Sequence, residues 1–342
     1  MKLVRLLIDR LYDIRALNKL KPLIDAVDAA MFGPAETTEG GPHIVDNVDL
    51  KRYMSYVIVA LLPATLASIY FYGWSVLRII IVSYIVGGVV EVIFAIVRKK
   101  EIHEGFLVTG LIFPLVLPPT TPLWVVAVGV VFGVLFGKEM FGGTGRNIFN
   151  PALVGRLFIT IAFPAIMTTN WQVPFTDAIT SATPLAVYKT TGSMASIYDL
   201  FVGKTAGSMG ETCRIAIIFG GLFLIFTKVS NWRIPVSYIG TVFVFAAIGN
   251  RLAPGSIAPP LFQVLTGGLL FGALFMATDP VTSPFTRMGK YSFGILCGIL
   301  TVLIRSFSGY VEGVMFSIVI MNALAPLIDH IVLMLKYRPV KI

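Results

Sequence analysis

Residues 76–97 read VLRIIIVSYIVGGVVEVIFAIV, an apolar run whose only charged side chains are Arg78 and Glu91. A transmembrane α-helix needs about 20 consecutive apolar residues to cross the hydrocarbon core of a bilayer. The 342-residue chain has the same character throughout, because 56% of its residues are hydrophobic and only 13% are charged. A soluble domain typically has about 25% charged residues. The sequence therefore predicts an all-α polytopic membrane protein and excludes a disordered chain, a coiled coil and an ordinary cytosolic enzyme.

Further apolar runs, bounded by charges or by Pro and Gly turns, bring the expected number of transmembrane helices to ten. The expected spans are 53–73, 76–97, 105–117, 122–137, 151–167, 213–228, 234–250, 261–277, 291–305 and 313–335. The third run is short and ends at Pro118-Pro119, as a broken or half helix would. The stretches LVTGLIF (107–113) and LTGGLLF (265–271) are similar, so two five-helix repeats would fit the chain.

The basic residues indicate the orientation of the chain. Most of the 27 Lys and Arg residues lie in the loops of one side if both termini are cytoplasmic. The net charge of +9 is then mostly a signal of topology, and we expect no nucleic-acid partner. The two cysteines, Cys213 and Cys297, and the three scattered histidines predict no metal site.

Residues 1–52 precede the first span and are expected to form a cytoplasmic amphipathic helix and a linker. Within 3–30, leucines recur at helical spacing between charged residues, which is typical of a helix on a membrane surface or against a partner subunit. A solvated helix without a partner is the alternative. Residues 53–342 are expected to form the ten-helix membrane domain, with a long outer loop at 168–212. Loops of that length in a compact protein are usually functional.

The outer loop contains the sequence DAITSATPL from Asp177 to Leu185. An acidic residue followed by an Ala-Thr pair resembles the acceptor motif of covalent flavinylation, in which a flavin transferase joins the phosphate of FMN to a threonine hydroxyl. A phosphoester needs an exposed hydroxyl, and the small neighbours Ser181 and Ala182 leave the hydroxyl of Thr183 unobstructed. An ordinary Ser/Thr turn is the alternative.

Four longer strings occur in the order in which the NqrB/RnfD family has them: VDLKR (48–52), GKEMFGGTGRNIFNPA (137–152), ATDPVT (277–282) and NALAPLIDH (322–330). From about residue 45 to its C-terminus, the chain resembles this family. Its members are the flavinylated membrane subunits of the sodium-translocating NADH:quinone reductase and of the Rnf ferredoxin:NAD+ oxidoreductase. The N-terminal extension and KEMFGGTGRN look more like NqrB, whereas TSATPL and Arg305-Ser306-Phe307 look more like RnfD. The branch stays open at this point.

The resemblance implies that Thr183 carries FMN through a phosphoester. Asp177, Ser181 and Ala182 would then belong to the motif that a periplasmic flavin transferase recognises. The loop that carries them is expected on the outer side, where such a transferase works.

The resemblance also implies a second, noncovalent flavin, riboflavin, near Asn147 and Asn150 on the inner side. Asparagine amides can pair with the donor and acceptor edge of an isoalloxazine ring. Capping of the helix that begins at Pro151 is the alternative for these asparagines, and both roles can hold together. Arg156 either faces this flavin or extends toward the membrane surface.

Ionisable groups within spans are costly and usually functional. In the quinone reductase branch, Gly87-Gly88 matches positions beside the quinone site, and Glu91 matches a position implicated in ion uptake. A close helix crossing and an ion pair between Glu91 and Arg98 are the alternatives. Asp279 and Asp329, at the inner ends of two spans, are further candidates for the ion path, with a helix cap or a salt bridge as the alternative.

The expected function is that of an electron-carrier subunit in an Rnf- or Nqr-type oxidoreductase that translocates Na+ or H+ across the cell inner membrane. The subunit would pass electrons between the two flavins. Expected partners are the other membrane subunits, an FMN-bearing outer subunit, an NADH or ferredoxin module, and quinone. The chain has no GxGxxG nucleotide domain, so we do not expect it to oxidise NADH alone. A redox-inert channel or secondary transporter of similar architecture is the alternative.

Overall fold

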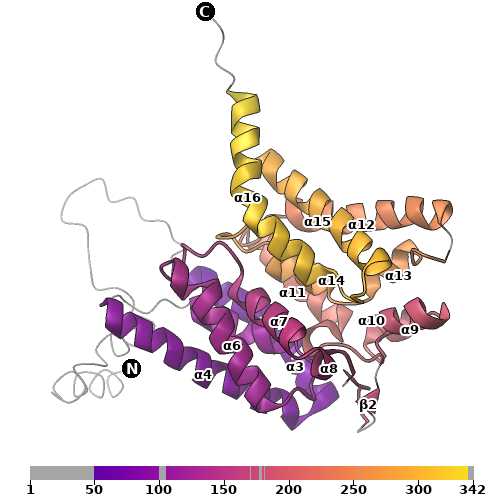
Figure 1. Ribbon diagram of the computed structural model, residues 1–342, viewed down its shortest axis with the longest axis horizontal. Coiled ribbons are helices and arrows are strands. Elements are labelled where there is room, and N and C mark those ends of the chain that lie inside the picture. The colour runs from indigo at the N-terminus through magenta and orange to yellow at the C-terminus, as the bar shows by residue number, and fades with distance from the viewer. Residues whose placement is uncertain are drawn as a thin grey trace, which may run out of the picture.

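The computed structural model describes residues 50–99, 105–169, 171–176, 179–180, 182–253 and 255–337. The expected N-terminal amphipathic helix and linker within 1–49 lie outside the described residues, as do Asp177 and Ser181 of the flavinylation motif. The described part is mostly helical, and Figure 1 shows its long helices in two groups, with α3, α4, α6 and α7 in one and α12, α15 and α16 in the other. The prediction of an all-helical fold is confirmed.

The first group is built on α4, which packs against both α5 and α6, while α6 packs against α7. Small residues allow this close approach. A Cβ atom at Gly133 of α6 would lie 2.5 Å from the carbonyl oxygen of Pro151, at the start of α7. The elements of this group are α3 (Leu50–Tyr72), α4 (Trp74–Arg98), α5 (Gly105–Leu115), α6 (Leu123–Gly137), η2 (Glu139–Phe141) and α7 (Pro151–Ala162).

The second group is built on α12, which packs against α13 and α15, while α15 packs against α16. Helix α11 packs against α3 and so joins the two groups. At the centre of the second group, the buried hydroxyl of Tyr238 shares hydrogen bonds with Thr301 (2.6 Å) and Ser317 (3.0 Å). The elements are α11 (Arg214–Phe226), α12 (Arg233–Leu252), α13 (Pro260–Leu265), α14 (Leu269–Phe271), the π-helical η4 (Gly272–Met276), α15 (Arg287–Phe307) and α16 (Val314–Lys336).

The connection between the two groups, which was expected on the outer side, holds short elements in its described residues. The strands β1 and β2 pair antiparallel, with Trp171 opposite Thr180. The elements in chain order are α8 (Pro164–Thr169), β1 (Trp171–Gln172), β2 (Ile179–Thr180), α9 (Pro184–Thr191), α10 (Ile197–Val202) and η3 (Met209–Glu211).

Six helices among the described residues are long and apolar enough to cross a membrane: 52–72, 74–98, 123–141, 233–252, 287–307 and 314–336. The chain is therefore a multi-pass membrane protein. The other four expected spans coincide with shorter elements: α5, α7, α11 and the segment from α13 to η4. The count of ten membrane helices and the two repeats stay predictions.

The expected continuous helix over 261–277 is wrong in detail. The segment is divided into α13, α14 and η4. The break lies at Thr266, which has extended backbone angles, and at Gly267, which has a φ of +62°. A left-handed φ is open to glycine and strained for most other residues, so the chain turns here without a steric cost.

Candidate functional sites

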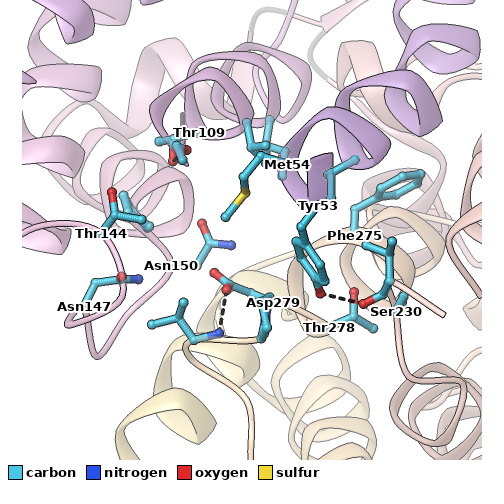
Figure 2. A pocket seen from close by; sticks show the side chains of 18 of the residues that line it. Tyr53, Met54, Thr109, Thr144, Asn147, Asn150, Ser230, Phe275, Thr278 and Asp279 are labelled. Atoms are coloured by element: carbon cyan, nitrogen blue, oxygen red, sulfur yellow. Dashed lines mark hydrogen bonds between the residues drawn. The ribbon is translucent and has the colours of Figure 1, made fainter. Parts of the chain in front are cut away.

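Side chains from both helix groups line a cavity of about 70 Å³, termed the inner cavity after the side on which Asn147 and Asn150 were expected. Figure 2 shows Asn150 and Asp279 at this cavity, which Met54, Tyr53 and Phe275 also line. Asn150 comes from the start of α7, whereas Asp279 follows η4. The structure thus brings together residues that were expected to serve a flavin and an ion path separately.

The two asparagines of the inner cavity have partly local roles. The side-chain oxygen of Asn150 accepts a hydrogen bond from the amide of Ala152 at 3.0 Å, so Asn150 caps α7 as the alternative interpretation proposed. The side-chain nitrogen of Asn147 donates to the carbonyl of Phe149 at 3.0 Å. These bonds use the side-chain oxygen of Asn150 and the side-chain nitrogen of Asn147, and both residues also line the cavity. The two roles are therefore compatible.

Asp279 lies in a turn just beyond η4. Its carboxylate accepts a hydrogen bond from the amide of Val281 at 3.0 Å, and its withdrawal from solvent raises the pKa of the carboxyl above its ordinary value. This acid is held by a backbone amide, and the described residues place no cation within ion-pair distance of it.

A wider groove of about 890 Å³ adjoins the inner cavity and shares Tyr53 and Asn147 with it. Asn322 and Asp329 of α16 line this groove. The carboxylate of Asp329 accepts hydrogen bonds from the amides of Phe285 (2.7 Å) and Thr286 (3.0 Å), and also from the Thr286 hydroxyl (2.5 Å). Asp329 therefore stabilises the turn that leads into α15, and the hydroxyl of Thr286 caps that helix.

Thr183 lines a separate cavity of about 150 Å³, termed the outer cavity after the side on which its loop was expected. It is half-buried and caps α9, since its hydroxyl oxygen accepts a hydrogen bond from the amide of Ala186 at 3.3 Å. Pro184 occupies the first position of that helix, which suits a residue without an amide hydrogen. The hydroxyl expected to carry FMN is thus fixed at the wall of a cavity. Ala182 precedes it and is also half-buried.

The structure places Arg156 in the outer cavity with Thr183, and this differs from its expected position beside Asn147 and Asn150. The reason is the length of α7. Arg156 lies six residues beyond Asn150, and a rise of 1.5 Å per residue carries it about 9 Å along the helix. Its side chain is 5% exposed and makes a long contact to the sulfur of Met167, at 3.7 Å. Nε has no hydrogen-bond partner among the described residues.

The outer cavity also holds two acids, Glu211 and Glu312. Glu312 accepts a hydrogen bond from Arg305 at 3.1 Å, and its second oxygen accepts one from the amide of Gly268 at 3.1 Å. Glu211 accepts one from the amide of Ser208 at 2.7 Å. Burial, with the nearby charge of Glu312, raises the pKa of Glu211. An acid in the short loop GYVEG (309–313), between two spans, was the signal that could have identified Glu312.

Gly87-Gly88 and Glu91 line none of these three cavities. A Cβ atom at Gly87 would lie 2.6 Å from the ring of Phe106 and 2.9 Å from Val130, so this glycine permits a close helix crossing. Glu91 forms a buried ion pair with Lys138. The expected alternative pair between Glu91 and Arg98 is wrong.

Arg98 pairs with Glu139 instead, at 2.9 Å, and also donates to the Glu139 carbonyl at 2.7 Å. The chain just after α6 therefore supplies the partners of both Glu91 and Arg98 of α4.

Four elements reach both the inner and the outer cavity. Helix α7 contributes Asn150 and Pro151 at one end and Thr160 at the other, and α11 contributes Leu224 and Arg214. Residues of the segment around α5, and of the segment from α14 to η4, also line both cavities. These are the elements that are too short to count as membrane spans. These short helical elements therefore lie between the two cavities.

Comparison with known proteins supplies an independent finding. A model of the NQR2, RnfD, RnfE family matches residues 37–338. The chain is 36% identical to a subunit of the Na(+)-translocating NADH-quinone reductase of Klebsiella pneumoniae and 39% identical to the same subunit of Azotobacter vinelandii. It is 37% identical to the corresponding subunit of Pseudomonas aeruginosa. Each alignment covers 92% of this chain and 92% of the relative.

Proposed function

Because the chain belongs to the NQR2, RnfD, RnfE family, we propose that it is the membrane electron-carrier subunit of an ion-translocating oxidoreductase of the Nqr type. The three relatives named above are subunits of a Na(+)-translocating NADH-quinone reductase. On this proposal the chain crosses the cell inner membrane ten times and works with other membrane subunits, an FMN-bearing outer subunit and an NADH module. It is not active alone.

The outer cavity is the proposed site of the covalent FMN on Thr183. A phosphodiester between FMN and threonine carries one negative charge, and a buried cation without an ion-pair partner is costly. Arg156 is such a cation among the described residues. The cavity thus offers both the hydroxyl that would hold the phosphate and a positive charge for an anionic cofactor. Asp177, Ser181 and Ala182 keep their proposed role in recognition by a flavin transferase.

The inner cavity and its adjoining groove are the proposed site of the second flavin, riboflavin. Asn147 and Asn150 supply amides, and Met54 and Phe275 supply apolar surface for a planar ring. Flavins accept one or two electrons, while the protein provides position and electrostatics. Asp279 lies in the same cavity, so it is the acid best placed to link flavin chemistry to an ion.

Two further parts of the proposal have less support from the cavities. Quinone beside Gly87-Gly88 and an ion path through Glu91 rest on the family, since these residues line none of the three spaces described above. Asp329 lines the groove, and its proposed place on the ion path would come in addition to its hydrogen bonds to Phe285 and Thr286.

One observation carries the proposal: residues at opposite ends of α7, and at opposite ends of α11, line the two cavities. From Asn150, in the inner cavity, to Thr160, in the outer one, α7 rises about 15 Å. Two flavins seated in these cavities would divide the crossing of the membrane into short steps. The alternative of a redox-inert channel or transporter has no use for a flavin-accepting threonine at the outer cavity.

The test is fluorescence of the denatured subunit on a gel, with mass spectrometry of the peptide around Thr183. The wild-type band should fluoresce and the peptide should carry the mass of FMN, whereas Thr183→Ala should be dark. Thr168→Ala is the matched control, because Thr168 is exposed and lines the same cavity. It should fluoresce like the wild type. A dark wild-type band after coexpression with a flavin transferase would favour the redox-inert alternative.

A further inference from the structure

Asn322, in the middle of α16, is a buried amide without a partner. Its side chain is 1% exposed, and neither its oxygen nor its nitrogen has a hydrogen-bond partner within the part of the chain that the structure describes. Leaving a buried donor or acceptor unpaired costs about 1–3 kcal/mol, and most such groups in native proteins are paired. A leucine would fill the same space without that cost. An amide at this position therefore points to a ligand.

The position of Asn322 indicates where that ligand would lie. Asn322 lines the groove of about 890 Å³ next to the inner cavity. Asn147 lines both spaces, and Tyr53 lies at their junction. Ile148 and Leu333 add apolar surface to the groove. A flat molecule with one polar edge could thus contact Asn147 and Asn322 together while its faces meet apolar side chains.

The two unpaired atoms restrict the chemistry of the ligand. An asparagine side chain offers a donor and an acceptor side by side. A partner that satisfies both must present an acceptor next to a donor. The pyrimidine edge of an isoalloxazine does so, because its C4 carbonyl adjoins the N3 hydrogen. A quinone presents carbonyl acceptors only and would leave the oxygen of Asn322 unpaired.

We propose that Asn322 binds the pyrimidine edge of the noncovalent flavin, its nitrogen donating to the C4 carbonyl and its oxygen accepting from N3–H. This assignment rests on the proposed function, because it takes the second flavin as given. It adds a polar contact from α16 to the amides of Asn147 and Asn150, which precede α7. No bond is made or broken in this step.

The first test measures noncovalent flavin in the purified multi-subunit complex, as the ratio of acid-extractable to covalently bound flavin. Asn322→Leu should lower riboflavin affinity about tenfold, which corresponds to the loss of two hydrogen bonds of ordinary strength. Asn322→Asp, which keeps the acceptor and loses the donor, should also lower it. Ser317→Ala, in the same helix and outside the groove, is the control for disturbed packing of α16 and should keep the wild-type ratio.

A second readout separates a binding role from a structural one. Since Asn322→Leu removes an unpaired buried amide, the flavin-free variant should unfold at the same temperature as the flavin-free wild type or a higher one. If Asn322 stabilised the fold itself, its replacement by leucine would lower the unfolding temperature instead. The analogue 3-methylriboflavin, which lacks N3–H, should bind wild type more weakly than riboflavin, and Asn322→Leu should reduce this difference.

The outcomes are distinguishable from failure of the proposed function. If wild type contains covalent flavin but no extractable flavin, the second flavin itself is wrong, and the inference is overturned with it. If wild type binds riboflavin and Asn322→Leu binds it equally well, only the inference is overturned. Equal affinity of wild type for riboflavin and 3-methylriboflavin would also overturn it.

Discussion

Arg305 and Glu312 form an ion pair of 3.1 Å that fastens the loop between α15 and α16 to the break between α13 and α14. Arg305 also donates to the carbonyls of Gln263 (2.7 Å) and Thr266 (3.0 Å), and Glu312 accepts from the amide of Gly268. The guanidinium is nearly buried, whereas about a quarter of the carboxylate side chain is exposed. Arg305 thus satisfies two of the carbonyls that the interrupted helix leaves free, while Arg214 donates to a third, the carbonyl of Leu265, at 2.9 Å.

Replacement of this arginine should destabilise the protein. Arg305→Met removes the donors to two buried carbonyls and leaves them unpaired, which costs about 1–3 kcal/mol for each group. The midpoint of thermal unfolding in detergent should fall. Arg251→Met, at an exposed arginine at the end of α12, is the control and should leave the midpoint nearly unchanged. Equal effects of the two substitutions would show that the network around Arg305 does not hold the break in place.

A methyl group at the break should have a comparable effect. Gly267 has a φ of +62°, and a Cβ atom there would collide with the carboxylate of Glu312 and lie 2.6 Å from Arg305. Gly267→Ala should therefore lower the thermal midpoint and displace the ion pair. Gly240→Ala is the matched control, since nothing described lies within 4 Å of a Cβ at that position in α12. Alanine favours the helix by about 1 kcal/mol there, so this control should be neutral or stabilising.

The buried pair of Glu91 and Lys138 gives a third prediction. Breaking a buried ion pair by removing one partner costs about 3–5 kcal/mol, because the other charge stays buried and unpaired. Glu91→Gln and Lys138→Met should each destabilise the protein strongly. The double variant should recover much of the loss, and chemical unfolding of the four proteins measures the coupling between the two sites. If the single effects simply add, the two side chains do not depend on each other.

The sequence predicted the long helices well because an apolar run of about 20 residues has the length that a helix needs to cross the hydrocarbon core of a bilayer. It could not locate the break at Thr266-Gly267, since hydrophobicity continues through it and only the backbone angles change. Sequence proximity suggested that Arg156 faces the same flavin as Asn150, with extension toward the membrane surface as the alternative. Six residues of helix instead separate the two side chains along the axis of α7, so they line different cavities. The alternative pair of Glu91 with Arg98 also followed from proximity in the sequence. The observed partner of Glu91 is Lys138, which directly follows α6. Contacts between distant segments do not follow from spacing in one segment.

Arg156 should influence the flavin of the outer cavity if the proposed function is right. Reduction adds negative charge to a flavin, and a nearby buried cation favours that charge. Arg156→Gln should therefore shift the midpoint potential of the covalent flavin to a more negative value, while Arg156→Lys, which keeps a positive charge, should shift it less. A redox titration of flavin absorbance in the purified complex measures both. The gel fluorescence of both variants should stay at the wild-type level, which separates loss of charge from loss of attachment. Identical potentials in all three proteins would place the flavin away from Arg156.

Glu211 should make stability depend on pH in a direction that its environment fixes. Burial, reinforced by the charge of Glu312, raises the pKa of Glu211 in the folded protein above that in the unfolded chain, where a glutamate titrates near pH 4.3. The folded state then binds a proton more readily than the unfolded state, so stability falls as pH rises from the unfolded pKa through the folded one.

Gln at this position stays neutral at every pH and can still accept the hydrogen bond from Ser208. Glu211→Gln should match the wild type in acid and become the more stable protein as the pH rises. The measurement is the difference between the thermal midpoints of the two proteins across a pH series, in which the contributions of other titrating groups cancel. A wild type that gains stability over Glu211→Gln on going to higher pH would mean that the arginines of the outer cavity, Arg156 and Arg214, outweigh the burial of this carboxyl.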